Sequence, residues 1–273
     1  MREDDSTKIF SVVAKCYKRE IFPSKSIQTR KDNDKELANL LKVFAHMPID
    51  AIAPMHVREY LDIRGQAAKV RANREKALLS HIFNKAREWG YTSLQNPCQS
   101  VKGFKETGRS RYITDVEFDQ VKAHAHFTVI DAMDLALLTG QRPADVLKLK
   151  RTDIRDGALW IVQNKTGQRL GVEVTGELAA VITRIAERPR QAISAWLIQD
   201  ENGQPLTQCT LRSRFDKARL LAKVDFQFRD IRAKAATDTG DLAHSQTLLG
   251  HKNRDMTEHY VKARVGERVK PLR

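Results

Sequence analysis

Residues 138–145 read Leu-Thr-Gly-Gln-Arg-Pro-Ala-Asp, and this stretch predicts where one helix ends and the next begins. An apolar helical pattern covers about residues 130–138, and the Thr-Gly pair ends it, because glycine readily adopts the left-handed backbone that closes a helix. Pro143 suits a first helical position, where no backbone N–H is needed. Arg142 and Asp145 therefore lie one turn apart at the start of the next helix.

Two further patterns follow in the same half of the chain. Arg-Asp-Ile-Arg occupies residues 229–232, and Leu-Leu-Gly-His ends at His251, nine positions before Tyr260. The two arginines are spaced i, i+3 on a predicted helix and are expected to share a face. Two guanidinium groups held together repel each other unless an anion lies between them, and a phosphate suits their planar, charged forks. The phenol of Tyr260 has a reference pKa of about 10 and needs a positive field or a proton acceptor to become a nucleophile.

The only convincing β pattern lies between these motifs. Residues 158–162 and 169–174 flank the turn Asn-Lys-Thr-Gly at 164–167, and the arrangement predicts a hairpin. This turn contains Lys165. After Gly176 the chain again has a helical pattern.

The first hundred residues predict a small helical unit. Its four helices are expected at about residues 6–23, 37–44, 54–61 and 67–89. Gly90 closes the last of them, and the polar stretch 96–111 has no clear period and is predicted to be a linker. We therefore expect a mainly α protein with a small antiparallel β-sheet, in which a helical domain at 1–105 precedes a mixed α+β domain at 106–273.

The chain is strongly basic, with 48 Lys and Arg against 34 Asp and Glu and a pI near 9.8. Residues 64–109 carry half of the net charge of +14. A polyanion would release counterions from such a patch, which favours nucleic acid over the alternative of a solvated basic face. The candidate DNA-binding residues are Arg64, Lys69, Arg71, Arg74, Lys76, Lys85, Arg87, Lys102 and Lys105. Trp89, Trp160 and Trp196 are expected to pack in the core rather than stack on bases.

Composition also excludes several classes of protein. Cys16, Cys98 and Cys209 are odd in number and far apart, which fits neither a disulfide framework nor a zinc site and predicts reduced cytoplasmic thiols. The polar, acidic start is not a signal peptide. No apolar run approaches the roughly 18 residues of a membrane span, and no segment combines the basic charge with an apolar face suited to a membrane surface.

Taken together, the motifs resemble those of the tyrosine recombinases, most closely the integrases of temperate bacteriophages and genomic islands. The resemblance extends into the basic half, through Ala-Asn-Arg-Glu at 72–75 and Ala-Arg-Glu-Trp-Gly at 86–90. It implies an N-terminal core-type DNA-binding domain and a catalytic domain. The catalytic residues that it implies are Arg142, Lys165, Arg229, Arg232, His251 and Tyr260, with Asp145 in support.

The resemblance also implies a role for each residue. Arg142 and Arg232 would hold the scissile phosphate, His251 would hydrogen-bond to it, and Lys165 would protonate the departing 5′ oxygen. Tyr260 would attack and form a 3′-phosphotyrosyl bond. Because that ester conserves the bond energy, no metal, ATP or other cofactor is expected. Lys148 and Lys150 are alternatives for the lysine.

One position departs from the family pattern. Arg229 stands where the family usually has a histidine that accepts the tyrosine proton, and an arginine cannot act as a base. It can add positive potential that lowers the tyrosine pKa and stabilises the phosphate. His259 is no obvious substitute because helix neighbours point in different directions, whereas His244, seven residues before His251, could face the same way.

The implied partner is double-stranded DNA at attachment sites. Four protomers would clamp two sites and exchange strands through a Holliday junction, and accessory DNA-bending proteins are candidate partners. The thirteen residues after Tyr260 are expected to pack against a neighbouring subunit, and an arm-binding domain is expected to be absent or removed. Two alternatives stay open, namely a DNA-binding protein of the same fold with little catalysis and a nicking-closing enzyme similar to type IB topoisomerases.

Overall fold

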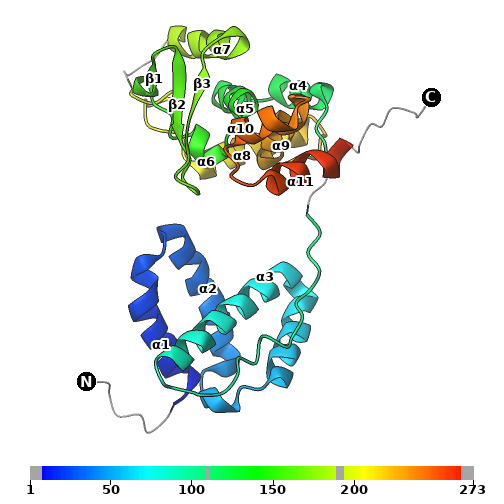
Figure 1. The fold of residues 1–273 in the computed structure, drawn as a ribbon. Helices are drawn as coiled ribbons and strands as arrows, with labels where there is room; N and C mark the ends of the chain where they lie inside the picture. The colour runs from blue at the N-terminus through cyan, green and yellow to red at the C-terminus, as the bar shows by residue number, and fades with distance from the viewer. Residues whose placement is uncertain (1–7, 109–110, 189–193, 266–273) are drawn as a thin grey trace, which may run out of the picture. The chain divides into compact units, whose positions relative to one another are not determined.

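The computed structural model describes residues 8–108, 111–188 and 194–265, without the side chains of 259, 260 and 262–265. The chain divides into two compact units, Met1–Gly108 and Arg109–Arg273 (Figure 1). Each unit has its own apolar core. No helix among the described residues is long and apolar enough to cross a membrane.

The N-terminal unit is entirely helical in its described part. Its elements are α1 (Phe10–Ile21), η1 (Phe22–Ser24), α2 (Ile27–Phe44), η2 (Ile49–Ala51) and α3 (Pro54–Glu88). The helices predicted at 54–61 and 67–89 form one element that bends at Ala68, where the backbone leaves the helical region. Aromatic side chains fill the centre of the unit, where the rings of Phe10 and Phe44 meet edge to face.

The first part of the predicted linker packs against this unit. Cys98 and Val101 are buried, and Asn73 on α3 pairs with the backbone of Phe104, donating to its oxygen at 2.8 Å and accepting from its N–H at 2.8 Å. Gly65 allows the close approach, since a Cβ there would lie 2.3 Å from the Phe104 ring. This docking could not be predicted from the sequence, because residues 96–111 lack a periodic pattern.

The C-terminal unit is mainly helical with a small sheet at one side (Figure 1). Its strands are β1 (Ile154–Arg155), β2 (Ala158–Val162) and β3 (Arg169–Glu173), and its other elements are α4 (Asp115–Ala123), α5 (Phe127–Thr139), α6 (Pro143–Val146), η3 (Arg151–Asp153), α7 (Gly176–Glu187), α8 (Gln208–Leu221), η4 (Phe228–Asp230), α9 (Ile231–Asp238), α10 (Leu242–Leu249) and α11 (Arg254–Val265). The strand order is β1-β2-β3, antiparallel throughout. The predicted hairpin is confirmed, and β1 is an addition that its two-residue length left unpredicted.

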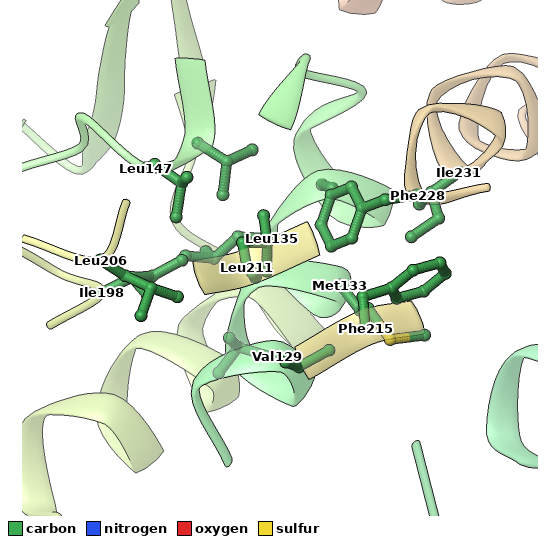
Figure 2. Close-up of a cluster of buried hydrophobic side chains, with 14 of the residues drawn as sticks. Val129, Met133, Leu135, Leu147, Ile198, Leu206, Leu211, Phe215, Phe228 and Ile231 are labelled. Atoms are coloured by element: carbon green, nitrogen blue, oxygen red, sulfur yellow. The ribbon is translucent and has the colours of Figure 1, made fainter. Parts of the chain in front are cut away.

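Helix α5 forms the centre of this unit. It contacts α6, α7, α8 and α9, and it is apolar on nearly every side, as a buried helix should be. Figure 2 shows its residues Met133 and Leu135 among side chains from other elements, including Phe215 of α8 and Ile231 of α9. This packing fixes the end of α5, and therefore the position of the motif that follows it.

The prediction that all three tryptophans lie in the core is wrong for Trp160. Its side chain is 39% exposed on the outer face of β2, with the Arg155 guanidinium 5.7 Å from the ring centre. The ring covers Gly171 on β3, where a Cβ would lie 3.3 Å from it. Trp89 and Trp196 are half-buried. An alternating strand puts every second residue on its outer face, and Trp160 falls there.

Candidate active site

Two helix ends meet around Arg232. Helix α5 ends at Gly140 and α10 ends at Gly250, and both glycines have the left-handed backbone that the sequence predicted for Gly140. The Arg232 guanidinium donates to the carbonyl of Gly140 at 2.6 Å and to that of Leu249 at 2.7 Å. Carbonyls at helix C-termini carry partial negative charge and lack helical partners, so a buried cation satisfies them.

This arrangement corrects the expectation about the arginine pair. Arg232 is 3% exposed on α9, whereas Arg229 lies in η4 with an exposed side chain. The two side chains therefore lie in different surroundings, Arg229 in the 3₁₀ turn η4 and Arg232 in the buried helix α9. Arg229 instead lines a hollow of about 500 Å³ together with Pro143 and Phe215. The Gly140 and Leu249 carbonyls and His251 thus accept hydrogen bonds from the buried Arg232 guanidinium within the protein.

His251 lies against Arg232. Its Nε2 is 3.1 Å from an Arg232 nitrogen, and its Nδ1 is 3.0 Å from the hydroxyl of Thr257. Arginine only donates, so Nε2 accepts and the proton is on Nδ1, which donates to Thr257. Burial, followed by the charges of Arg232 and Arg142, lowers the pKa of His251 to about 4. The ring is therefore neutral at physiological pH, and both arginines lie close enough to affect it.

Asp145 anchors the β2–β3 turn to α6. Its carboxylate is fully buried and accepts from the backbone N–H of Asn164 at 2.7 Å. Lys148 lies 3.6 Å and Arg142 3.9 Å from the same carboxylate. Asp145 thus contacts both the turn and the first arginine of the set.

Lys165 lies in this turn with an exposed side chain. Both alternative lysines make other contacts. The Lys148 ammonium donates to the Val162 carbonyl and to the Asn164 side chain, so it is bonded to the start of the turn. The Lys150 ammonium lies 4.9 Å from the centre of the Trp196 ring. Lys148 and Lys150 thus have neighbours that hold their ammonium groups, whereas Lys165 is exposed in the turn.

Two glutamines that sequence reasoning did not select connect these parts. Gln163 is 1% exposed and donates to Gln141 and to the Leu249 carbonyl, both at 2.8 Å. Gln141 in turn donates to the Leu248 carbonyl at 3.0 Å. The strand pattern did contain a signal for Gln163. Leu159 and Ile161 point inward, and the same alternation puts Gln163, a polar residue, on the buried side.

Helix α11 carries Tyr260, whose side chain, like that of His259, lies outside the described residues. The helix is tied to the site one turn earlier, where Thr257 is fully buried and bonded to His251. His244 is exposed on α10, whereas His251 is buried beyond the end of that helix. The two histidines therefore do not lie in the same surroundings.

The predicted DNA-binding residues fall into two groups. Arg64 binds the buried Glu75 at 3.0 Å, and Lys76 donates to the Val101 carbonyl. Lys85 and Arg74 also have acidic partners, at 2.5 and 3.7 Å respectively. The second group is exposed and has no acidic partner within the described part of the chain: Lys69, Arg71, Arg87, Lys102 and Lys105. This second group can bind an outside anion without breaking an ion pair or the bond from Lys76 to the Val101 carbonyl.

Comparison with known proteins agrees with the fold and the motifs. Residues 118–267 match the model of the phage integrase family, which is more than half of the chain. The chain therefore belongs to the phage integrase family of tyrosine recombinases. It is 27% identical to prophage integrase IntE of Escherichia coli K12 over 86% of its own length, and 29% identical to the integrase of Escherichia phage HK022 over 85%. These matches cover 68% and 66% of the relatives, so the chain spans about two thirds of their length.

Solved structures share the fold. A lambda integrase dimer bound to a COC′ core site superposes with a TM-score of 0.86 at 21% identity, covering 96% of this chain and 99% of the other. A lambda integrase tetramer bound to a Holliday junction gives 0.86 at 22% identity, with 98% and 81% covered. The Tn1549 transposon integrase in complex with circular intermediate DNA gives 0.73 at 16% identity, with 94% and 95% covered.

Proposed function

We propose that this chain is a site-specific DNA recombinase that cuts and rejoins duplex DNA through a 3′-phosphotyrosyl intermediate. One observation carries the proposal, namely the buried pair of Arg232 and neutral His251 at the meeting point of α5, α9 and α10. A preorganised cation beside a hydrogen-bonding ring suits a phosphodiester that gains negative charge during attack. Arg142 would complete the phosphate site as the second guanidinium fork.

In the proposed reaction the Tyr260 phenol loses its proton to solvent, its oxygen attacks phosphorus, the new P–O bond to the tyrosine forms, and the bond to the 5′ oxygen breaks. Lys165 gives its proton to that oxygen, and rejoining runs the same steps backwards. Thr257 allows His251 to adapt, since a hydroxyl can donate as well as accept. With Thr257 donating to Nδ1, the ring proton would be on Nε2, and both Nε2 and the Arg232 nitrogen now bonded to it would donate to the phosphate oxygens instead.

Arg229 cannot accept the phenol proton, but its exposed guanidinium adds positive potential near η4. The proposed partner is double-stranded DNA at attachment sites, bound by the exposed basic residues of the N-terminal unit. The relatives solved as a dimer on a core site and as a tetramer on a Holliday junction support assembly of four protomers on two sites. Accessory DNA-bending proteins are proposed as further partners.

Covalent trapping tests the proposal. Purified chain is mixed, in excess chelator, with fragments spanning the junctions of the DNA element that encodes it, and is run on a denaturing gel beside Tyr260→Phe. We expect a protein–DNA adduct that the variant does not form, and sequencing the attached DNA identifies the site. Native-gel binding without an adduct would favour a silent DNA-binding protein. An adduct that never leads to joined sites would favour a nicking-closing enzyme similar to type IB topoisomerases.

A further inference from the structure

The amide of Gln163, just beyond the end of β2, is hydrogen-bonded on every side. Its nitrogen donates to the Gln141 side chain and to the Leu249 carbonyl, each at 2.8 Å. Its oxygen accepts from the Thr166 hydroxyl at 2.8 Å and from Arg142 at 3.4 Å. An amide has two donors and two acceptor sites, so all four are in use. A buried polar network that is fully satisfied fixes one arrangement of its members.

The partners of Gln163 belong to separate parts of the candidate site. Thr166 follows Lys165 directly in the turn, and Arg142 is the first arginine of the set. The Leu249 carbonyl also accepts from Arg232 at 2.7 Å, so its two lone pairs hold one bond from each side chain. Gly250 permits this contact, since a Cβ there would lie 3.0 Å from the Gln163 nitrogen.

We propose that Gln163 is a positioning residue that holds the Lys165 turn in register with the two phosphate-binding arginines. This inference rests on the function proposed above. Lys165 itself is exposed in a four-residue turn, and its reach toward the 5′ oxygen depends on where that turn is held. Asp145 holds the turn by accepting from the backbone N–H of Asn164. Gln163 instead connects the turn to the arginines, through Thr166 on one side and Arg142 on the other. Misplacement of a reacting group by about 1 Å costs about 10²-fold in rate.

Four variants separate positioning from folding. Gln163→Met keeps the side-chain length and removes every hydrogen bond of the amide. Thr166→Val removes the hydroxyl that donates to the Gln163 oxygen at 2.8 Å and accepts from the Gln168 backbone N–H at 3.4 Å, and Thr166→Ser restores both bonds. Gln168→Met is the matched control, because it makes the same change at the other end of the turn, where the side chain makes no hydrogen bond within the described residues.

Hydrogen exchange of the free protein measures the turn directly. The Gln163 and Gly167 backbone N–H groups each bond across the turn at 2.9 Å. We expect their exchange to rise about tenfold or more in Gln163→Met, which corresponds to about 1.4 kcal/mol, and to stay unchanged in Gln168→Met. Equal protection in both variants would overturn the proposal.

Cleavage of two substrates then tests the route through Lys165. The probe is the duplex recovered by covalent trapping, made with either oxygen or sulfur as the bridging 5′ atom. A thiol has a pKa near 8.5, so sulfur departs without needing a proton. We expect Lys165→Ala, Gln163→Met and Thr166→Val to cleave the oxygen substrate about 10²-fold more slowly or worse and to regain near wild-type rates with sulfur. Thr166→Ser should cleave both substrates at the wild-type rate.

The outcomes distinguish the two proposals. If Lys165→Ala is restored by sulfur but Gln163→Met is slow on both substrates, Gln163 acts through the arginines or the fold and the proposal for Gln163 is wrong. Wild-type rates for Gln163→Met and Thr166→Val would also overturn it. If Lys165→Ala is not restored by sulfur, the role assigned to Lys165 fails, and the proposal for Gln163 falls with it.

Discussion

The neutral state of His251 predicts a specific loss of stability in acid. Burial beside Arg232 and Arg142 lowers the folded-state pKa to about 4, whereas the unfolded chain should titrate near 6.5. Between these values the unfolded state binds a proton that the folded state does not. The contribution of neutral His251 to the free energy of unfolding is therefore complete above about pH 6.5, and it falls as the pH drops toward 4. Linkage gives a loss of about 2 kcal/mol from pH 7.5 to pH 5.

The assay compares the chain with His251→Gln, which removes the titration and keeps a polar side chain. Urea unfolding is followed by fluorescence in a Trp89→Phe background, so that both remaining tryptophans, Trp160 and Trp196, report on the C-terminal unit. Other groups titrate equally in both proteins, and the difference between the two curves isolates His251. His244→Gln removes an exposed histidine and is the matched control.

Between pH 7.5 and pH 5, the free energy of unfolding of His251→Gln should fall by about 2 kcal/mol less than that of its parent. It is also less stable at pH 7.5, because its hydrogen bonds to Arg232 and Thr257 change. The test is therefore the change in the free energy of unfolding with pH, and not its absolute value at one pH. Parallel curves for the two proteins would refute the reasoning, because they would mean that the His251 ring is as easily protonated in the folded state as in the unfolded chain.

Three further predictions concern Thr257, the basic residues of α3 and Arg229. Thr257→Val leaves the His251 Nδ1–H buried without its partner, so the C-terminal unit should lose about 1–3 kcal/mol in urea unfolding, while Thr257→Ser should lose much less. Arg71→Gln should reduce the slope of log K against log salt concentration for DNA binding by about 0.9. Arg64→Gln should leave that slope unchanged and should instead destabilise the N-terminal unit, because the buried Glu75 carboxylate loses its cationic partner. Arg229→His should preserve or raise adduct formation in the trapping assay, because an imidazole can accept the phenol proton; a severe loss would show that Arg229 has a role of its own.

Local signals in the sequence were enough for the backbone around the site. A glycine ended α5, a proline began α6, and alternation around a polar turn placed the hairpin, because each depends on the conformational preference of a few neighbouring residues. The Thr114–Glu117 capping box begins α4 for the same reason, with Glu117 donating its N–H to the Thr114 hydroxyl at 3.2 Å. The motifs also identified the family, which comparison confirms.

The sequence by itself therefore determined the helical and strand boundaries near the motifs, the basic character of the N-terminal unit and the family. Only the tertiary structure decided which groups accept hydrogen bonds from Arg232, which direction Arg229 takes, and that Gln163 joins the turn to the arginines. Those facts depend mainly on contacts between residues far apart in the chain, such as Arg232 with the Leu249 and Gly140 carbonyls, which are 17 and 92 positions away. No local preference encodes such pairs, because the packing of α5, α9 and α10 against one another creates them.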